Sequence, residues 1–349
     1  MATKVTLQDV ADALGVSRNT VSKAINNTGI LADSTREKVL KKAIEMGYKQ
    51  FSYANSLSDI QNPVINTANG EIVLFTGGFI GQSHFAATML DKFQYEISLM
   101  GYSLTMHRVD QSNIANHTLP ISFRKENAKA IICIEMFDQA YCELICSLGL
   151  PTLLVDAPVS SYWRPLNADI LLMNNTANIF TLIHDFQKSG IKKIGFIGET
   201  THCRSFFERF MAYRNAMYIN NLHIDEKFCL TEVHAHDSKY KNYLQTALSK
   251  LDELPELFIC ANDFVAIDVL DILKDLGYKC PEDIKLFGFD DSPESKVMSP
   301  SLSSCHIHSQ IMGYSAANML MARIKQPDLN YRITYSATDL IYRESTRLT

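Results

Sequence analysis

The sequence predicts an α/β protein, with an all-α N-terminal segment followed by a larger core of parallel sheets flanked by helices. Three observations carry this prediction. Two capped amphipathic helices separated by a glycine turn, and a third helix after them, fill the first 49 residues. Apolar strands and amphipathic helices alternate from residue 71 onward. The alternation restarts near residue 169, which indicates a core of two lobes.

Length and composition set the class of protein. At 349 residues, of which 46% are apolar, the chain can bury a sizeable core and has room for two or three domains. No apolar run approaches the roughly 18 to 20 residues that a membrane helix needs, and the N-terminus lacks the apolar region of a signal peptide. We therefore expect a cytoplasmic protein with no membrane partner.

The eight cysteines are scattered without a CxxC pair and stand mostly among apolar neighbours. This pattern favours reduced, buried thiols over disulfides or a zinc site. We expect no metal and no cofactor.

The first helix is predicted to begin after Thr6 and to end at Gly15. Thr6 can cap it, with Asp9 at its third position, and one face is then apolar, formed by Leu7, Val10, Ala11 and Leu14. Ser17 can cap a second helix after the turn. The inward face of that helix is apolar, with Val21, Ala24 and Ile25, and its outward face is polar, with Arg18, Asn19, Ser22, Lys23 and Asn26.

A third helix completes the segment. Ser34 to Glu37 (STRE) has the pattern of a capping box, and Gly47 is expected to end the helix. Residues 1–49 carry a net charge of +3, and the remaining residues carry −8. This asymmetry has the sign that binding to nucleic acid requires.

Two short helices joined by a tight glycine-containing turn form a helix-turn-helix. The outward face of the second helix points to DNA, because Arg and Lys can bond guanine acceptors or phosphates and Asn can bond adenine in the major groove. The alternative is a small helical bundle with a solvated polar face.

The segments TLQDVADALGVSRNTVSKAIN, from Thr6, and STREKVLKKAIEMGYK, from Ser34, resemble the headpiece of the lactose and galactose repressor family of bacterial transcriptional regulators. The resemblance implies that Arg18, Asn19 and Lys23 read bases. It also implies a wider set of DNA-contacting residues: Thr6, Ser17, Thr20, Ser22, Asn26, Tyr48, Ala54 and Leu57. The expected partner is a double-stranded, pseudo-palindromic operator, because one headpiece reads few bases and a dimer reads two half-sites.

Residues 50–70 are predicted to be a hinge helix and linker after the headpiece of residues 1–49. In the resembled family the hinge becomes helical on DNA and wedges an apolar side chain into the minor groove, and that pattern falls here on SYANSLSD, with Ala54 and Leu57. The chain departs from the pattern where the family usually has a proline and basic residues, since Gln50, Phe51 and Tyr53 stand there.

The core is expected to alternate strands and helices. Strands are predicted over residues 72–76, 103–109, 130–135, 152–155, 169–173, 193–198, 257–260 and 284–289. Helices are predicted over residues 85–100, 141–148, 176–189, 205–220 and 263–276. Ligands of such folds lie beyond the carboxyl ends of the strands, so the expected site is the cleft between the lobes.

The stretch ANDFVAIDVLDILKDLGYKCPEDIKLFGFDD, from Ala261 to Asp291, resembles the sugar-binding core of the same family, which is similar to periplasmic sugar-binding proteins. In that fold the chain crosses between the lobes three times. The resemblance therefore places lobe one at about residues 71–172 and 306–332, and lobe two at about 173–305 and 333–349. The whole core, residues 71–349, is expected to bind an effector and to dimerise.

Several polar side chains follow predicted strands and are expected to meet in the cleft. The resemblance implies that the effector is bound by Asp156, Arg209, Asn262 and Asp290, with Phe85 as an aromatic face. Carboxylates, an amide and a guanidinium form paired hydrogen bonds to vicinal hydroxyls, which is the chemistry that a sugar requires.

Alternatives stand beside these residues. Asp263 can be a helix N-cap and Asp291 can close a turn, while Phe79 and Trp163 are further aromatic candidates. Arg209 is expected beside the buried face of its helix and not on it, because Phe206, Phe210 and Tyr213 form the apolar stripe.

Histidines form two further pairs. His234 and His236, beside Asp237, can line the pocket, and a metal is disfavoured because no third ligand has matching spacing. His306 and His308 stand at a predicted lobe crossover, where they are either pH-sensitive contacts or histidines with satisfied hydrogen bonds.

No nucleophile elbow, phosphate loop or His-Glu zinc helix occurs in the sequence, so we do not expect an enzyme. The predicted function is a sequence-specific transcriptional regulator, most simply a repressor, controlled by a small ligand. A sugar or sugar derivative is favoured, and a purine or a corepressor protein is left open. The alternative class is a carbohydrate-binding protein or enzyme of the same core fold. A homodimer is expected, with a tetramer left open.

Overall fold

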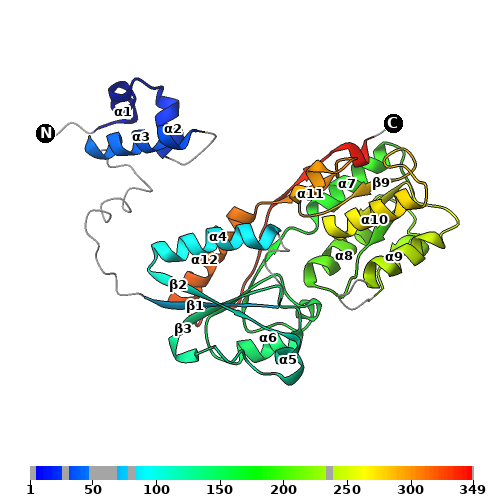
Figure 1. Ribbon diagram of the computed structural model, residues 1–349, viewed down its shortest axis with the longest axis horizontal. Coiled ribbons are helices and arrows are strands. Elements are labelled where there is room, and N and C mark those ends of the chain that lie inside the picture. The colour runs from blue at the N-terminus through cyan, green and yellow to red at the C-terminus, as the bar shows by residue number, and fades with distance from the viewer. Residues whose placement is uncertain (1–4, 26–30, 47–68, 78–83, 233–238, 348–349) are drawn as a thin grey trace. The chain divides into compact units, whose positions relative to one another are not determined.

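The computed structural model describes residues 5–25, 31–46, 69–77, 84–232 and 239–347 (Figure 1). The chain divides into two compact units, Met1–Thr67 and Ala68–Thr349. Among the described residues, no helix is both long enough and apolar enough to cross a membrane.

The described residues of the first unit form three helices, α1 (Leu7–Leu14), α2 (Arg18–Ile25) and α3 (Asp33–Glu45). The predicted capping of α1 is confirmed, because the Thr6 hydroxyl accepts from the Asp9 N–H and the Asp9 carboxylate accepts from the Thr6 N–H. Gly15 ends α1 in the left-handed region, with φ of 66°, which glycine adopts without a steric penalty.

The second predicted cap is also confirmed, because the Ser17 hydroxyl accepts from the Thr20 N–H at 3.0 Å. The third is wrong, since α3 begins at Asp33 and Ser34 therefore lies inside the helix. One apolar cluster holds the three helices together; its buried members are Val10, Ala11, Val21, Ala24, Ile25, Val39 and Ala43.

Lobe one of the second unit is built on a six-stranded sheet with the order β11-β5-β4-β3-β1-β2. Its strands, all paired in parallel, are β1 (Gly70–Thr76), β2 (Tyr102–Arg108), β3 (Ala128–Ile134), β4 (Thr152–Val155), β5 (Asp169–Met173) and β11 (Ile333–Ser336). Its helices are α4 (His84–Leu99), α5 (Gln111–Asn116), α6 (Gln139–Cys146) and α12 (Ser309–Lys325).

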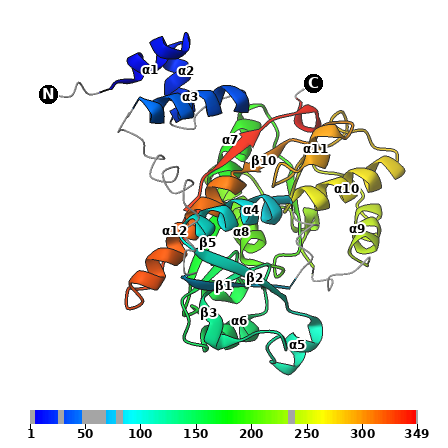
Figure 2. The same cartoon turned by 60° about the vertical axis from the view of Figure 1, so that its left-hand side comes forward.

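Two helices cover one face of this sheet and a third packs on the other. α4 and α12 lie side by side in both views and share an apolar cluster with the inward side chains of β1 and β3 (Figures 1 and 2). They approach closely, because a Cβ atom added to Gly313 would lie 2.3 Å from the backbone oxygen of Met89. α6 packs on the opposite face, against Val73 and Ile131.

Lobe two is built on a four-stranded parallel sheet with the order β7-β6-β8-β9. The strands are β6 (Ile194–Ile197), β7 (Cys229–Leu230), β8 (Leu257–Cys260) and β9 (Lys285–Phe287). α7 (Ala177–Lys188) and α8 (Arg204–Ile219) share a cluster with one face, and α9 (Lys239–Ser249) and α10 (Asp263–Asp275) share a cluster with the other. A short helix, α11 (Pro293–Val297), follows β9.

The lobes are joined by β10 (Ser304–Ile307) and β12 (Thr338–Ile341), which pair with each other in antiparallel fashion, and by the segment between β5 and α7. One boundary differs from the prediction: β11 pairs in parallel with β5, so residues 333–336 belong to lobe one and not to lobe two. The sequence alone did not mark this strand, because it lies at a sheet edge and has two exposed positions, Ile333 and Tyr335.

The predicted core elements are all present, with ends shifted by a few residues at most. Within the described part of the core, the structure adds four short 3₁₀ helices, η4 (Lys125–Asn127), η5 (Val159–Tyr162), η6 (Glu226–Phe228) and η7 (Glu344–Thr346). α5, α9, α11, α12, β7 and β10 to β12 were not predicted. All eight cysteines are free, and five of them are buried.

Candidate DNA-reading helix and effector-binding cluster

Helix α2 presents a polar face opposite its apolar one. Arg18 and Asn19 are exposed and Lys23 is half-buried, whereas Val21 and Ala24 are buried in the three-helix core. Thr20 and Ser22 are half-buried, and Thr6 and Ser17 are held at the caps of α1 and α2. The other predicted DNA contacts lie outside the described residues: Asn26, Tyr48, Ala54 and Leu57. The start of α2 therefore offers a guanidinium and an amide to a partner.

In the second unit, Asp156 follows β4 at the carboxyl edge of the lobe-one sheet. Its Oδ1 accepts hydrogen bonds from the N–H groups of Ala157, at 2.8 Å, and Ser205, at 3.2 Å. The Cys203 thiol is a further partner of this carboxyl group. Burial raises the pKa of Asp156, and these hydrogen bonds act against the increase. Because Ser205 belongs to α8, Asp156 links the two lobes.

Arg209 lies on the buried face of α8, with 2% of its surface exposed. Its Nη1 donates to the Ala261 carbonyl at 2.6 Å, and its Nε donates to Asn175 Oδ1 at 2.9 Å. The guanidinium lies over the ring of Phe289, 3.5 Å from the centroid. The prediction that Arg209 lies beside the buried face is wrong, because α8 is packed along a wider stripe than its aromatic residues alone define.

Asp290 follows Phe289, and its carboxylate lies 3.9 Å from Nη1 of Arg209. The pKa of Asp290 is raised to about 8. Burial is the main cause, the positive charge of Arg209 acts against it, and the negative charges of Asp263, Asp156 and Glu135 add to it. Asp156, Arg209 and Asp290 therefore form one cluster at the boundary between the lobes. It can offer acceptors and donors to a ligand rich in hydroxyl groups.

The raised pKa of Asp290 makes stability depend on pH. The unfolded carboxyl group loses its proton near pH 3.8 and the folded one near pH 8, so the folded state binds more protons inside this window. The wild-type chain should therefore lose stability as the pH rises through the window, by at most about 1.4 kcal/mol per pH unit from this group. Asp290→Asn should remove that loss.

Urea unfolding of both proteins across the same pH range measures the difference. Asp263, whose pKa is also raised, to about 6, interacts with the charge of Asp290, so its own contribution differs between the two proteins and the measured difference belongs to the pair. Parallel stability curves would contradict this account of Asp290.

Asn262 is the N-cap of α10, where its Oδ1 accepts from the Val265 N–H at 2.9 Å. Asp263 is thus the first helical residue and not the cap. It is fully buried, and its two oxygens accept from the Ser304 hydroxyl, at 2.6 Å, and from the Ser292 N–H, at 2.7 Å. Through these bonds Asp263 has a structural role, because it joins α10 to β10.

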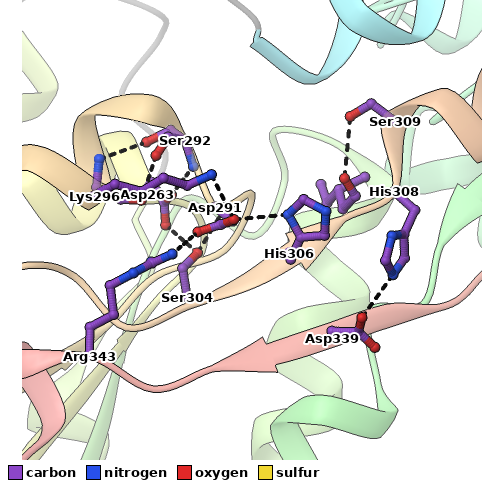
Figure 3. A network of polar contacts seen from close by, with 12 residues as sticks. Asp263, Asp291, Ser292, Lys296, Ser304, His306, His308, Ser309, Asp339 and Arg343 are labelled. Carbon is purple, nitrogen blue, oxygen red and sulfur yellow. Dashed lines mark hydrogen bonds and ion pairs between the residues drawn. The ribbon is translucent and has the colours of Figure 1, made fainter. Parts of the chain in front are cut away.

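Asp291 lies in a network on the crossover strands (Figure 3). Its carboxylate binds Arg343, Lys296 at 3.0 Å and the Nδ1 of His306 at 2.9 Å. Burial alone would raise the pKa of Asp291, but these partners outweigh it and hold the pKa below its ordinary value. On the same strand pair, Nε2 of His308 bonds Asp339 at 3.0 Å. Both histidines therefore have hydrogen-bond partners.

The aromatic candidates differ in their surroundings. Phe85 is half-buried and packs against the apolar cluster under α4, while Trp163 is 61% exposed and lies edge-on to Phe207. Other candidates lie outside the described residues: Phe79, His234, His236 and Asp237. Among the described residues, no group of three or more His, Cys, Asp or Glu could hold a metal ion.

A separate pocket of about 580 Å³ lies where the end of α7 meets the C-terminal segment. Its lining contains none of the predicted effector residues and consists of Asp185, Phe186, Ser189, Ser301, Tyr342, Arg343, Glu344, Thr346 and Arg347. The pocket is therefore a different site from the cluster around Arg209.

The sequence missed three residues of this cluster: Asn175, Cys203 and Phe289. Asn175 could have been found, because it follows a predicted strand at the same sheet edge as Asp156. Phe289 was assigned to a strand, and only the fold shows its ring under the Arg209 guanidinium.

Comparison with known proteins adds two family matches. Residues 6–50 match the model described as bacterial regulatory proteins, lacI family, and residues 183–346 match the periplasmic binding protein-like domain. The chain is 28% identical to the transcriptional regulator GalR of Lacticaseibacillus casei, over 98% of this chain and 99% of that one. It is 26% identical to the transcriptional repressor PurR of Haemophilus influenzae, over 98% of each chain.

Among solved structures, the transcriptional regulator CelR in complex with cellobiose superposes with a TM-score of 0.67 and 20% identity. The match covers 98% of this chain and all of the other. At this identity the match shows a shared fold, from the helical headpiece to the two-lobed core.

Proposed function

Because the chain belongs to the lacI family of bacterial regulatory proteins, we propose that it represses transcription from an operator, with an affinity set by a small molecule bound between its two core lobes. It is a DNA-binding transcriptional regulator and not an enzyme. The observation that carries the proposed control is the cluster of the buried Arg209 with the half-buried Asp156 and Asp290, to which both lobes contribute.

For DNA, we propose that Arg18, Asn19 and Lys23 read base edges and that the residues around them contact the sugar-phosphate backbone of the DNA. These contacts to the DNA backbone are made by Thr6, Ser17, Thr20, Ser22, Asn26 and Tyr48. Ala54 and Leu57 belong to the hinge, which wedges an apolar side chain into the minor groove. One helix reads only a few bases, so a homodimer on a pseudo-palindromic operator supplies the second half-site. A tetramer is an outcome that sedimentation would reveal. Operator binding implies a cytoplasmic location.

Asn19→Ala should relax base choice at one position of each half-site and cost roughly 1 to 3 kcal/mol of specific binding, because the amide that bonds a base edge is lost. Lys41→Ala, at an exposed position of α3, is the control and should weaken all sequences alike. Selection of preferred operators from a random DNA pool measures both effects. An unchanged operator preference for Asn19→Ala would show that this residue does not read bases.

For the effector, we propose a sugar or sugar derivative held by Asp156, Arg209, Asn262 and Asp290, with Phe85 as its aromatic face. Two carboxyl groups and a guanidinium are suited to paired hydrogen bonds with vicinal hydroxyls. The cellobiose complex of the structural relative supports a carbohydrate in this fold.

A ligand panel tests the proposal. Cellobiose, galactose, hypoxanthine and guanine are each titrated against the full chain, and melting temperature and operator affinity are measured. A true effector should raise the melting temperature with concentration and change operator affinity, because it binds one state of the protein more tightly. A response to a purine alone would overturn the carbohydrate assignment, and operator binding unaffected by any small molecule would favour a protein corepressor.

A further inference from the structure

A chain of buried hydrogen bonds runs from Arg209 to the contact between the lobes. Arg209 donates from Nε to Asn175 Oδ1 at 2.9 Å, and Asn175 donates from Nδ2 to Glu208 Oε2 at 3.0 Å. Asn175 stands on the segment that joins β5 of lobe one to α7 of lobe two. These two hydrogen bonds therefore connect the effector cluster to a segment that joins the lobes.

The chain continues into lobe one through Glu208. Its Oε1 accepts from the Tyr335 hydroxyl, at 2.9 Å, and from Nε of Arg204, at 2.7 Å. Tyr335 lies on β11 in lobe one, whereas Arg204 and Glu208 lie on α8 in lobe two. Arg204 also donates to the Tyr335 hydroxyl, at 3.3 Å, and lies over the ring of Tyr162 in η5. Two residues of lobe two thus hold two aromatic residues of lobe one.

Burial makes these links interdependent. Asn175, Arg204, Glu208 and Arg209 are each no more than 8% exposed. In such surroundings a broken bond leaves a polar group unpaired at full desolvation cost, so the bonds favour a single arrangement. Nη1 of Arg204 is buried without a hydrogen-bond partner. The position of this guanidinium is therefore not explained by hydrogen bonding of all its donors.

We propose that Asn175 and Glu208 are positioning residues that couple the guanidinium of Arg209 to the lobe contact at Tyr335. This inference rests on the proposed function, in which Arg209 binds the effector. A ligand that binds Arg209 changes the hydrogen bond between Arg209 and Asn175. Because Asn175 also bonds Glu208, the change reaches the hydrogen bond between Glu208 and Tyr335. The ligand then binds one lobe arrangement more tightly than another, which is the condition for allosteric control.

The lobe contact can be followed without any ligand. Trp163 is the only tryptophan of the chain, and it lies in lobe one with its ring centroid 6.2 Å from that of Phe207 in lobe two. Tyr335→Phe removes one hydroxyl and should loosen the contact, so quenching of Trp163 emission by acrylamide should increase in the folded full-length protein. Tyr331→Phe, just before the same strand, is the matched control and should leave quenching unchanged. Equal quenching in wild type and Tyr335→Phe would show that the hydroxyl does not hold the lobes.

A double-mutant cycle tests the intermediate residues. Arg209→Lys and Tyr335→Phe change residues for which the structure gives no direct contact with each other, yet their effects on the urea unfolding equilibrium should couple by about fivefold. In a Glu208→Gln background, which alters the link between them, the coupling should fall below about twofold. Additive effects, or coupling that persists in that background, would overturn the proposal.

Neither measurement requires an effector. A chain that binds none of the tested ligands would contradict the proposed function, while the cycle would still decide whether Glu208 couples Arg209 to Tyr335. If quenching rises but the cycle is additive, Tyr335 holds the lobes without a connection to Arg209, and the proposed coupling is wrong.

Discussion

Arg209→Met is expected to abolish the effector's influence on operator affinity. Methionine keeps an apolar stem against the ring of Phe289 but removes every donor, so the ligand and the Ala261 carbonyl both lose their partner. Both the ligand-dependent rise in melting temperature and the ligand-dependent change in operator affinity should disappear. Operator affinity without ligand should stay within a few-fold of wild type, because the headpiece is a separate unit.

Arg214→Met is the matched control on the same helix. Arg214 is more exposed and forms a surface ion pair with Glu226, so its loss should change stability by at most about 1 kcal/mol and leave the effector response intact. Melting temperature, operator affinity and ligand response are measured on both variants. A retained ligand response in Arg209→Met would contradict the effector assignment and show that Arg209 has a structural role instead.

Asp169→Asn is expected to produce the largest loss of stability, about 3 to 5 kcal/mol, because it leaves the buried guanidinium of Arg323 without its counter-charge. Arg323 bonds the carboxylate from Nη2 at 2.8 Å and from Nε at 3.1 Å, and both side chains are at most 3% exposed. The N–H of Arg332 adds a third bond at 2.8 Å, which ties the segment before β11 to the start of β5. Urea unfolding of the full chain measures the loss.

The same pair gives a pH dependence of known sign. Burial raises the pKa of Asp169, but the bonds from Arg323 and Arg332 outweigh it and hold the pKa below its ordinary value. This contribution is therefore fully present above the ordinary pKa of about 3.9 and is lost as the pH falls through the lower folded value. The stability gap between wild type and Asp169→Asn should narrow in acid.

Asp268→Asn is the control for this pair. The side chain of Asp268 is 38% exposed and pairs with Lys241 at 2.9 Å, so the same substitution there should cost at most about 1 kcal/mol. Equal losses at the two positions would contradict the importance of burial at Asp169.

In the described part of the headpiece, most caps and helices could be predicted because they are set by local chemistry. The caps at Thr6 and Ser17, the left-handed turn at Gly15 and the apolar spacing of α1 and α2 all act within a few residues. The exception is Ser34, where a capping pattern occurs but the helix begins one residue earlier. Strands and helices of the core were likewise visible, since burial against a sheet imposes its own periodicity.

By itself, the sequence determined most of the core strands and helices, the two-lobed core and the polar residues at strand ends. Tertiary structure alone decided that Arg209 is buried between a carboxylate and the ring of Phe289, and that Tyr335 joins the sheet of lobe one. The physical reason is distance along the chain. Arg209 and its partner Asn175 are separated by 34 residues, and Glu208 and Tyr335 by 127, so no local pattern records their contact. Such bonds form only when the packing of both lobes has excluded water from the groups that make them.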